Sequence, residues 1–135
     1  MTILDVEVVS LPVSDQERSK AFYVDHLGLE LRNDAVFGDN LRWLQVAPKG
    51  CPCSIALVTW FPGMLAGSSQ GLILRVDDIE ATLADLTSKG IPTFSGIEAA
   101  PWGRFVRISD PDGNGLILQQ DEAMSDGLGS DSARS

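Results

Sequence analysis

The sequence predicts an α+β fold built from two βαβββ modules in tandem, and two observations carry that prediction. The first is an internal repeat, in which Val13 and Val76 lie 63 positions apart and Gly28 and Gly90 lie 62 apart. The second is that both halves show the same order of local signals, a short β-type run, a helix and three further strands. The same spacing pairs Arg42 with Arg104, Trp43 with Phe105, Pro48 with Pro111 and Gly50 with Gly113.

The first module starts with the β-type run "VEVVSLPV" at 6–13. Ser14 followed by Glu17 is the pattern of a capping box, so we expect a helix to begin there. Gly28 is the expected C-terminal stop of that helix, because glycine readily adopts the left-handed conformation that ends helices. Strands are then expected at 29–33, 40–47 and 53–60.

The second module starts with "GLILRV" at 71–76, and Asp77 or Asp78 is the expected N-cap of its helix. Gly90 is the expected stop. The buried stripe of this helix is predicted to consist of Ile79, Leu83 and Leu86. Its strands are expected at 91–95, 103–109 and 115–120.

The domain organisation follows from this repeat. We expect one domain over residues 1–120, made of modules at about 3–60 and 70–120 with a Gly-, Ser- and Pro-rich linker at 61–69. Residues 121–135 lack periodicity and apolar content, so a disordered tail is expected there.

The acidic segment "DPDGNG" from Asp110 to Gly115 has two interpretations, a β-hairpin or a calcium loop. In a calcium loop that begins at Asp110, the twelfth position, which supplies a bidentate carboxylate, would be Asp121. The intervening "LILQQ" is typical of a strand, and Pro111 with Gly113 suits a tight turn. We therefore predict a hairpin.

Charge and composition exclude several classes of partner. The formal net charge of −9 argues against nucleic acid and anionic membranes, because like charges repel, whereas cationic small molecules stay plausible. No secretory leader and no 18-residue apolar run is found, so a cytoplasmic protein is expected. Cys51 and Cys53 are too close together for easy disulfide geometry, and we expect two reduced thiols.

The tandem βαβββ pattern, "LPVSDQERSKAFYVDHLGL" near the start and "DPDGNG" near the end resemble the vicinal oxygen chelate superfamily. That superfamily includes glyoxalase I, extradiol dioxygenases and bleomycin-resistance proteins. The resemblance covers residues 3–120 and implies a cup formed by two curved half-sheets. It also implies a homodimer, since two half-barrels commonly complete each other's clefts.

In the metalloenzymes that this chain resembles, metal ligands stand at four places on the inner face of the cup. The matching positions are Val8, Ala56, Gly71 and Ile117, and none of these side chains can coordinate a divalent cation. The single histidine, His26, lies at the expected helix end. The resemblance therefore implies a protein without a metal and without another cofactor.

Pleat alternation predicts which residues line the cleft beside those four positions. Trp43, Phe61 and Trp102 lie on or beside strands, where their rings could stack a flat or cationic ligand, and core or interface positions are the alternative. Arg42 could bind an anionic group or pair with surface acids. The complete predicted lining consists of Val8, Ser10, Arg42, Trp43, Ala56, Val58, Phe61, Gly71, Ile73, Trp102, Ile117 and Gln119.

Three functions fit these observations. The first is a metal-independent binding protein that holds or sequesters a small organic molecule such as a drug or natural product, as in the bleomycin-resistance branch. The second is an enzyme related to glyoxalases or dioxygenases with an absent or unusual metal site; no nucleophile constellation appears, and Glu7, Tyr23 and Glu98 are the conceivable acid–base groups. The third is an interaction module whose cup is filled by its own side chains.

Overall fold

The computed structural model describes residues 1–122 and divides into two compact units. Unit 1 comprises Met1–Gln70 together with Asp110–Asn114, and unit 2 comprises Gly71–Ser109 together with the described residues from Gly115 onward. Each unit contains one four-stranded mixed sheet and the helical segment that precedes its last three strands. The predicted α+β fold of two βαβββ modules is confirmed.

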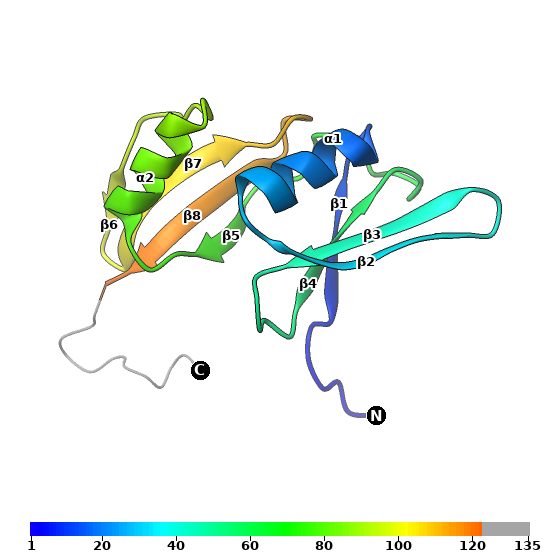
Figure 1. The fold of residues 1–135 in the computed structure, drawn as a ribbon. Coiled ribbons are helices and arrows are strands. Elements are labelled where there is room, and N and C mark those ends of the chain that lie inside the picture. Colours follow the sequence, from blue (N-terminus) through cyan, green and yellow to red (C-terminus); the bar gives the residue numbers. More distant parts are fainter. Residues whose placement is uncertain (123–135) are drawn as a thin grey trace. The chain divides into compact units, whose positions relative to one another are not determined.

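In unit 1 the sheet has the strand order β1-β4-β3-β2 (Figure 1). Strands β1 and β4 pair in parallel, and the other neighbours are antiparallel. The elements are β1 (Val8–Pro12), α1 (Gln16–Lys20), the π-helix η1 (Ala21–His26), β2 (Glu30–Phe37), β3 (Leu41–Ala47) and β4 (Ser54–Val58).

The first helix begins one residue later than the predicted capping box. Asp15 is the N-cap, with an extended backbone (φ −139°) and a carboxylate that accepts a bond from the Arg18 backbone N–H at 3.1 Å. The Ser14 hydroxyl donates to Asp112 instead. Gly28 has a φ of +79° just past the end of η1, so the predicted stop is confirmed.

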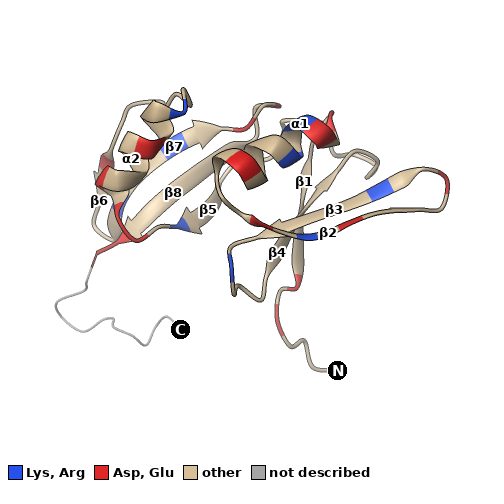
Figure 2. Cartoon of the chain, in the orientation of Figure 1, with Lys and Arg blue, Asp and Glu red and all other residues tan. Residues whose placement is uncertain are grey.

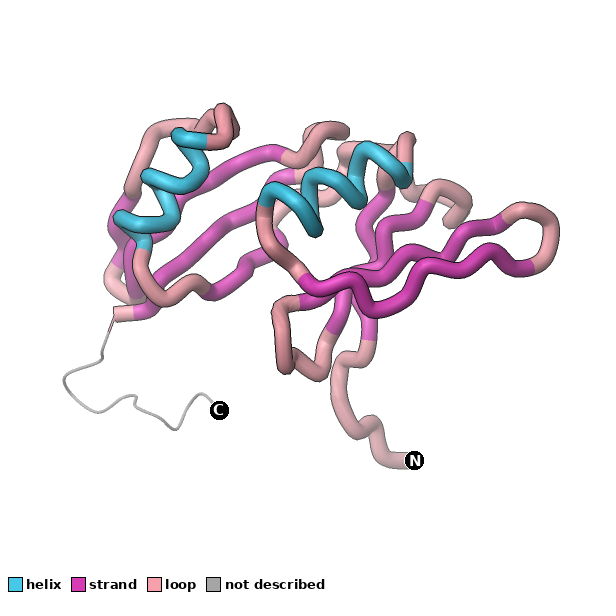
Figure 3. The backbone as a smooth tube through the Cα atoms, in the orientation of Figure 1, coloured by secondary structure: helices cyan, strands magenta, loops and turns pink. Residues whose placement is uncertain are grey.

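The helix of unit 1 lies along one face of its sheet, as the tube in Figure 3 shows. The Gln16 side-chain amide donates to the carbonyls of Arg42 and Leu57, both at 2.8 Å, and so fixes α1 over β3 and β4. Burial of each large apolar side chain under the helix contributes roughly 1.5–3 kcal/mol. The buried apolar residues of unit 1 include Leu11, Val13, Phe22, Leu44, Val46, Ile55 and Leu57.

Unit 2 repeats this topology with the strand order β5-β8-β7-β6, and β5 pairs with β8 in parallel. Asp78 is the N-cap of its helix, as one of the two predicted possibilities, and accepts from the Ala81 backbone N–H at 3.0 Å. The elements are β5 (Leu72–Arg75), α2 (Ile79–Ser88), β6 (Glu98–Ala100), β7 (Gly103–Ser109) and β8 (Gly115–Asp121). Its core includes Ile79, Leu86, Ile91, Val106, Ile108, Leu116 and Leu118.

The strand predicted at 91–95 is wrong, because β6 lies at Glu98–Ala100. Pro92 has no backbone N–H to donate, and the N–H of Ile91 bonds back to the end of α2 at Leu86. Only Phe94 reaches β7, through one bond to the Arg107 carbonyl.

Other strand boundaries differ by a few residues. Strand β2 continues to Phe37, four residues beyond the predicted 29–33, and all eight of its residues are exposed. Strand β8 includes Asp121, which the sequence analysis had assigned to the tail; residues 123–135 of that tail lie outside the described part. Within residues 1–122, no helix is both long enough and apolar enough to cross a membrane.

Candidate functional site

The face of the unit 1 sheet turned away from α1, hereafter the helix-free face, carries five of the twelve predicted cleft residues. The register pairs Val8 with Ser54 and Ser10 with Ala56, and Gln45 with Ala56, so these side chains share a face. Alternation along β3 and β4 adds Trp43 and Val58 to it. Ser54, Ala56 and Val58 are buried, whereas Val8, Ser10, Trp43 and Gln45 are half-buried.

Four rings form an aromatic cluster at one end of this face. The Trp60 ring lies 6.2 Å from Trp43, 5.9 Å from Phe37 and 5.7 Å from Phe61, between ring centroids. All three contacts have tilted or edge-on geometry, which is favourable for aromatic pairs. Trp60 and Phe37 were missed by the sequence analysis; the adjacent aromatics "WF" at the end of β4 were the available signal for Trp60.

A strip of polar side chains crosses the same face. The Trp43 indole N–H donates to Gln45 Oε1 at 2.6 Å, and Gln45 Nε2 donates to Ser54 Oγ at 2.6 Å. Ser54 Oγ donates onward to the Glu7 backbone carbonyl at 3.4 Å. These bonds hold a half-buried amide in a fixed orientation beside the aromatic cluster.

Arg42 lies on the opposite, helix-bearing face of the sheet. Its guanidinium contacts Asp34 at 2.8 Å and Glu17 at 2.8 Å, and Lys20 bonds the same Asp34 carboxylate at 2.9 Å. Arg42 and Lys20 hold the pKa of Asp34 well below its usual range, and Asp34 raises the pKa of Arg42. Figure 2 shows these charges on α1 and on the β2–β3 hairpin. The Arg42 guanidinium therefore forms its ion pairs on the face opposite Trp43 and the aromatic cluster.

The helix-free face of the unit 2 sheet holds three further predicted lining residues, Ile73, Ile117 and Gln119. Ile73 pairs with Ile117 and Arg75 with Gln119 across β5 and β8, and Ile73 is 52% exposed. Gly71 precedes β5 with a φ of +92°, and Trp102 lies between β6 and β7 with 57% of its surface exposed.

This second face is polar at its margins, where two ion pairs lie. Arg75 pairs with Asp121 at 2.7 Å, and Arg107 pairs with Glu98 at 2.6 Å. The Arg107 guanidinium also lies 5.5 Å from the centre of the Phe94 ring. The bond from Arg107 lowers the pKa of Glu98, which therefore stays ionised and engaged rather than poised for proton transfer.

The hairpin turn Asp110–Asn114 is built around a buried carboxylate. Asp110 is 4% exposed and accepts four bonds: from the Tyr23 hydroxyl at 2.7 Å, from the backbone N–H groups of Asp112 and Asn114 at 2.9 Å, and from the Asn114 amide at 2.8 Å. Burial, and then the Asp110 charge, raise the pKa of Tyr23 far above its usual range. Tyr23 is therefore a permanent donor. The turn is structural, and the predicted hairpin is confirmed.

The comparison with protein families decides the identity of this architecture. The family model described as the glyoxalase/bleomycin resistance protein/dioxygenase superfamily matches residues 5–118. The chain belongs to this superfamily.

Several known proteins are similar to this chain along nearly their whole length. TnmS3, an antibiotic binding protein from Streptomyces sp. CB03234, is 48% identical over 90% of this chain and 99% of that chain, with a TM-score of 0.85. A glyoxalase/bleomycin resistance protein from the same strain is 47% identical over 86% of this chain and 100% of that chain, with a TM-score of 0.78. The uncharacterized protein YetH of Bacillus subtilis strain 168 is 30% identical over 87% of this chain and 99% of its own length.

The four positions that the resemblance matches to the metal ligands of the superfamily's metalloenzymes carry no side chain that could hold a metal. Val8, Ala56, Gly71 and Ile117 offer no nitrogen or oxygen side-chain donor. Within residues 1–122, no three His, Cys, Asp or Glu side chains gather in a way that could hold an ion. The chemistry that this superfamily member can offer at these positions is apolar contact.

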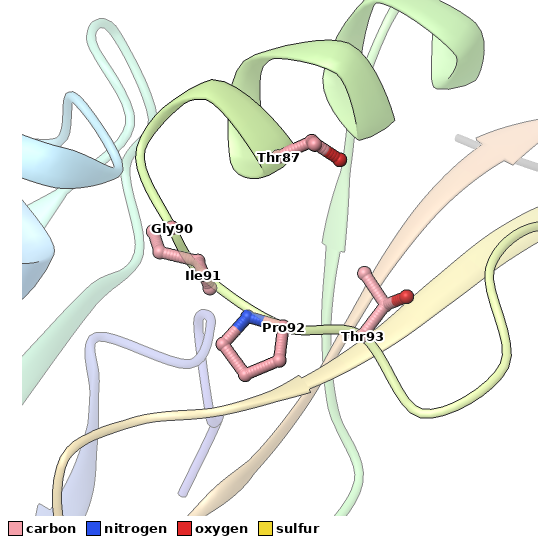
Figure 4. Close-up of a pocket in the computed structure, with 5 residues that line it drawn as sticks. All are labelled: Thr87, Gly90, Ile91, Pro92 and Thr93. Atoms are coloured by element: carbon pink, nitrogen blue, oxygen red, sulfur yellow. The ribbon is translucent and has the colours of Figure 1, made fainter.

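One open hollow lies at the C-terminal end of α2, lined by Thr87, Gly90, Ile91, Pro92 and Thr93 (Figure 4). None of the twelve predicted cleft residues lines it. It has no charged or aromatic side chain in its wall, so it lacks the groups that would orient a ligand. We place the candidate site on the helix-free face of unit 1.

Proposed function

We propose that this protein binds a small organic molecule of the antibiotic or natural-product type against the helix-free face of unit 1, and thereby sequesters it. The observation that carries the proposal is the aromatic cluster of Phe37, Trp43, Trp60 and Phe61 beside buried, small Ala56 and Val58. Half-exposed indole rings around small side chains form a surface on which a flat ring system can stack.

The relatives support this choice of ligand. TnmS3 is an antibiotic binding protein, and at 48% identity it shares nearly its whole length with this chain. The site lies on a face of the fold where strand register already groups apolar and aromatic side chains.

Stacking rather than ion pairing is the main attraction that we propose. Among the described strand residues on the helix-free face of unit 1, Glu30 is the only acidic one. Its carboxylate already pairs with Arg32 at 2.7 Å. The chain's net charge of −9 would still raise the local concentration of a cationic ligand, and the ring faces would attract its charge.

We propose further that binding needs no metal and that the protein acts as a homodimer in the cytoplasm. The first part is supported by Val8, Ala56, Gly71 and Ile117, which offer no ligating atom at the four positions that the resemblance matches to metal ligands. Exposed Val36, Ile73, Phe94 and Trp102 support an interface with a second copy, because large apolar groups in water are costly. The free thiols of Cys51 and Cys53 suit a reducing compartment.

Tryptophan fluorescence tests the binding proposal, since the chain has three tryptophans and two of them lie in the aromatic cluster. The protein is titrated with bleomycin, 2-naphthoic acid and S-benzylglutathione. At least one probe should quench the emission, and Trp60→Ala should weaken its binding about tenfold. Trp102→Phe is the matched control and should bind unchanged. Flat responses to every probe, or a response lost only in Trp102→Phe, contradict the proposal.

Two further measurements test the other parts. Elemental analysis of purified protein should find no stoichiometric divalent ion, and a chelator-sensitive ion at one per chain would overturn metal independence. Light scattering after size-exclusion chromatography should give twice the chain mass of 14.5 kDa, and a monomer would contradict the dimer.

A further inference from the structure

We propose that Gln45 selects the ligand, and that the ligand class is a flat aromatic molecule carrying a carbonyl oxygen. This inference rests on the proposed function, because it concerns the same helix-free face. It assigns a polar recognition role to a residue that sequence patterns had not singled out.

The orientation of the Gln45 amide is fixed by chemistry. An indole N–H is only a donor, so the amide oxygen, and not the nitrogen, must face Trp43 at 2.6 Å. The amide nitrogen then faces Ser54 Oγ at 2.6 Å. Ser54 is 3% exposed and donates its own proton to the Glu7 carbonyl, so it must accept from Gln45. Both ends of the amide are therefore held.

One N–H of this amide is left over. A glutamine amide has two N–H donors, and in residues 1–122 only the bond to Ser54 uses one of them. Gln45 is half-buried, bonded to Trp43 of the aromatic cluster and opposite Ala56, so a ring stacked there would displace water from the remaining donor. A ring without an acceptor would leave that donor unpaired, whereas a carbonyl oxygen on the ring would accept its proton.

The corresponding position in unit 2 cannot play this part. By the repeat spacing, Arg107 stands where unit 1 has Gln45, and Arg107 is engaged with Glu98 at 2.6 Å and with the Phe94 ring. The oriented neutral donor beside indole rings is thus a feature of unit 1.

Two isosteric probes and NMR of the ¹⁵N-labelled protein test the inference. Coumarin is a flat bicycle with a carbonyl oxygen, and naphthalene is a flat bicycle without one. Coumarin should bind about three- to tenfold more tightly, as one net hydrogen bond provides, and should shift the Gln45 side-chain amide signals. Gln45→Glu keeps an acceptor for Trp43 and lets the Ser54 hydroxyl donate, but it removes both N–H groups. It should abolish the preference for coumarin while naphthalene affinity stays within about twofold.

The controls separate this inference from the proposed function. Ser54→Ala removes the group that positions Gln45 and should shift its amide signals and lower coumarin affinity, with naphthalene again unchanged. If both probes perturb the indole signals of Trp43 and Trp60 equally, and Gln45→Glu changes neither affinity, the selection role is wrong and the aromatic site stands. If neither probe perturbs those indole signals, the aromatic site itself is wrong, and the inference falls with it.

Discussion

The two units share a topology, and their helix-bearing faces are alike down to single ion pairs. In unit 1 Arg42 on β3 reaches Glu17 of the helix, and in unit 2 the equivalent Arg104 on β7 reaches Glu80 of α2. The helix-free faces differ. Trp43 and Gln45 of unit 1 face a cluster of rings, whereas Phe105 and Arg107 of unit 2 share their face with ion pairs. The comparison teaches that helix packing constrains one face of each sheet, while the other is available for a unit-specific role.

The turns that follow the third strand of each module show a similar contrast. Gly50 and Gly113 both have positive φ, of 78° and 98°, so the turns share a backbone feature. Ala47 before the first turn is fully buried and apolar, and Asp110 before the second is a buried carboxylate with four donors. The first turn is held from outside, by the Arg32 guanidinium, which donates to the carbonyls of Pro48 and Cys51 at 3.0 Å, whereas the second turn is organised around its own buried carboxylate.

Asp110→Ala should have the largest effect. It leaves the Tyr23 hydroxyl, the Asn114 amide and two backbone N–H groups without their acceptor in a buried site, so unfolding should become easier by about 3 kcal/mol or more. Tyr23→Phe removes a single bond to the charge and should cost about 1.5–3 kcal/mol. Urea denaturation measures both, and equal losses would contradict the central role of Asp110.

Gln45→Arg makes the helix-free face of unit 1 resemble that of unit 2. The guanidinium cannot accept the Trp43 indole proton and finds no partner equivalent to Glu98, so we expect about 1–2 kcal/mol of lost stability. Probe binding in the fluorescence titration should also be lost. Arg107→Gln in unit 2 is the matched control and should leave binding unchanged; normal binding by Gln45→Arg would remove the proposed distinction between the faces.

Asp34→Asn tests the helix-bearing face. In the folded protein, Arg42 and Lys20 lower the pKa of Asp34 below its value of about 4 in the unfolded chain. The Asp34 carboxylate therefore stabilises the fold above pH ~4, and this stabilisation is lost as the pH falls further. The substitution should therefore cost about 1 kcal/mol at pH 7 and progressively less below pH ~4. Thermal unfolding across this pH range measures the difference. A cost that does not shrink in acid would assign the role of Asp34 to packing rather than to charge.

Ser19→Ala should have the smallest effect, in the opposite direction. The Ser19 hydroxyl is fully buried, and in the described part of the chain it has no hydrogen-bond partner, whereas the equivalent Thr82 hydroxyl in α2 donates to the Asp78 carbonyl at 2.8 Å. Removing the first hydroxyl should be neutral or stabilising by up to about 1 kcal/mol, and Thr82→Ser, which keeps the bond, serves as the reference in unit 2. A loss above that margin would reveal a partner for Ser19 in solution.

Sequence patterns were sufficient for features with local causes. Period-two alternation grouped Val8, Ser10, Ala56 and Val58, and the repeat spacing made Arg42 and Arg104 equivalent. The helix ends at Gly28 and Gly90 were predictable because both positions need a positive φ, which glycine adopts most readily.

Features that depend on distant partners were not predictable in this way. The bond from Tyr23 to Asp110 joins residues 87 positions apart, and nothing local marks either residue as buried. Trp60 is the centre of the aromatic cluster because the fold brings Phe37 of β2 and Trp43 of β3 beside it, both distant in sequence. The prediction of a strand at 91–95 was wrong because pairing with a neighbouring strand, rather than β-propensity, decides where an edge strand forms.

The Trp43–Trp60 pair has an optical consequence. Two indoles with centroids 6.2 Å apart and planes inclined by 57° are close enough for their strong transitions to couple as excitons. Such coupling splits the far-ultraviolet circular dichroism into a pair of bands of opposite sign, which disappears if either ring is replaced or reoriented. The circular dichroism of the unlabelled protein therefore reports on the geometry of the aromatic cluster.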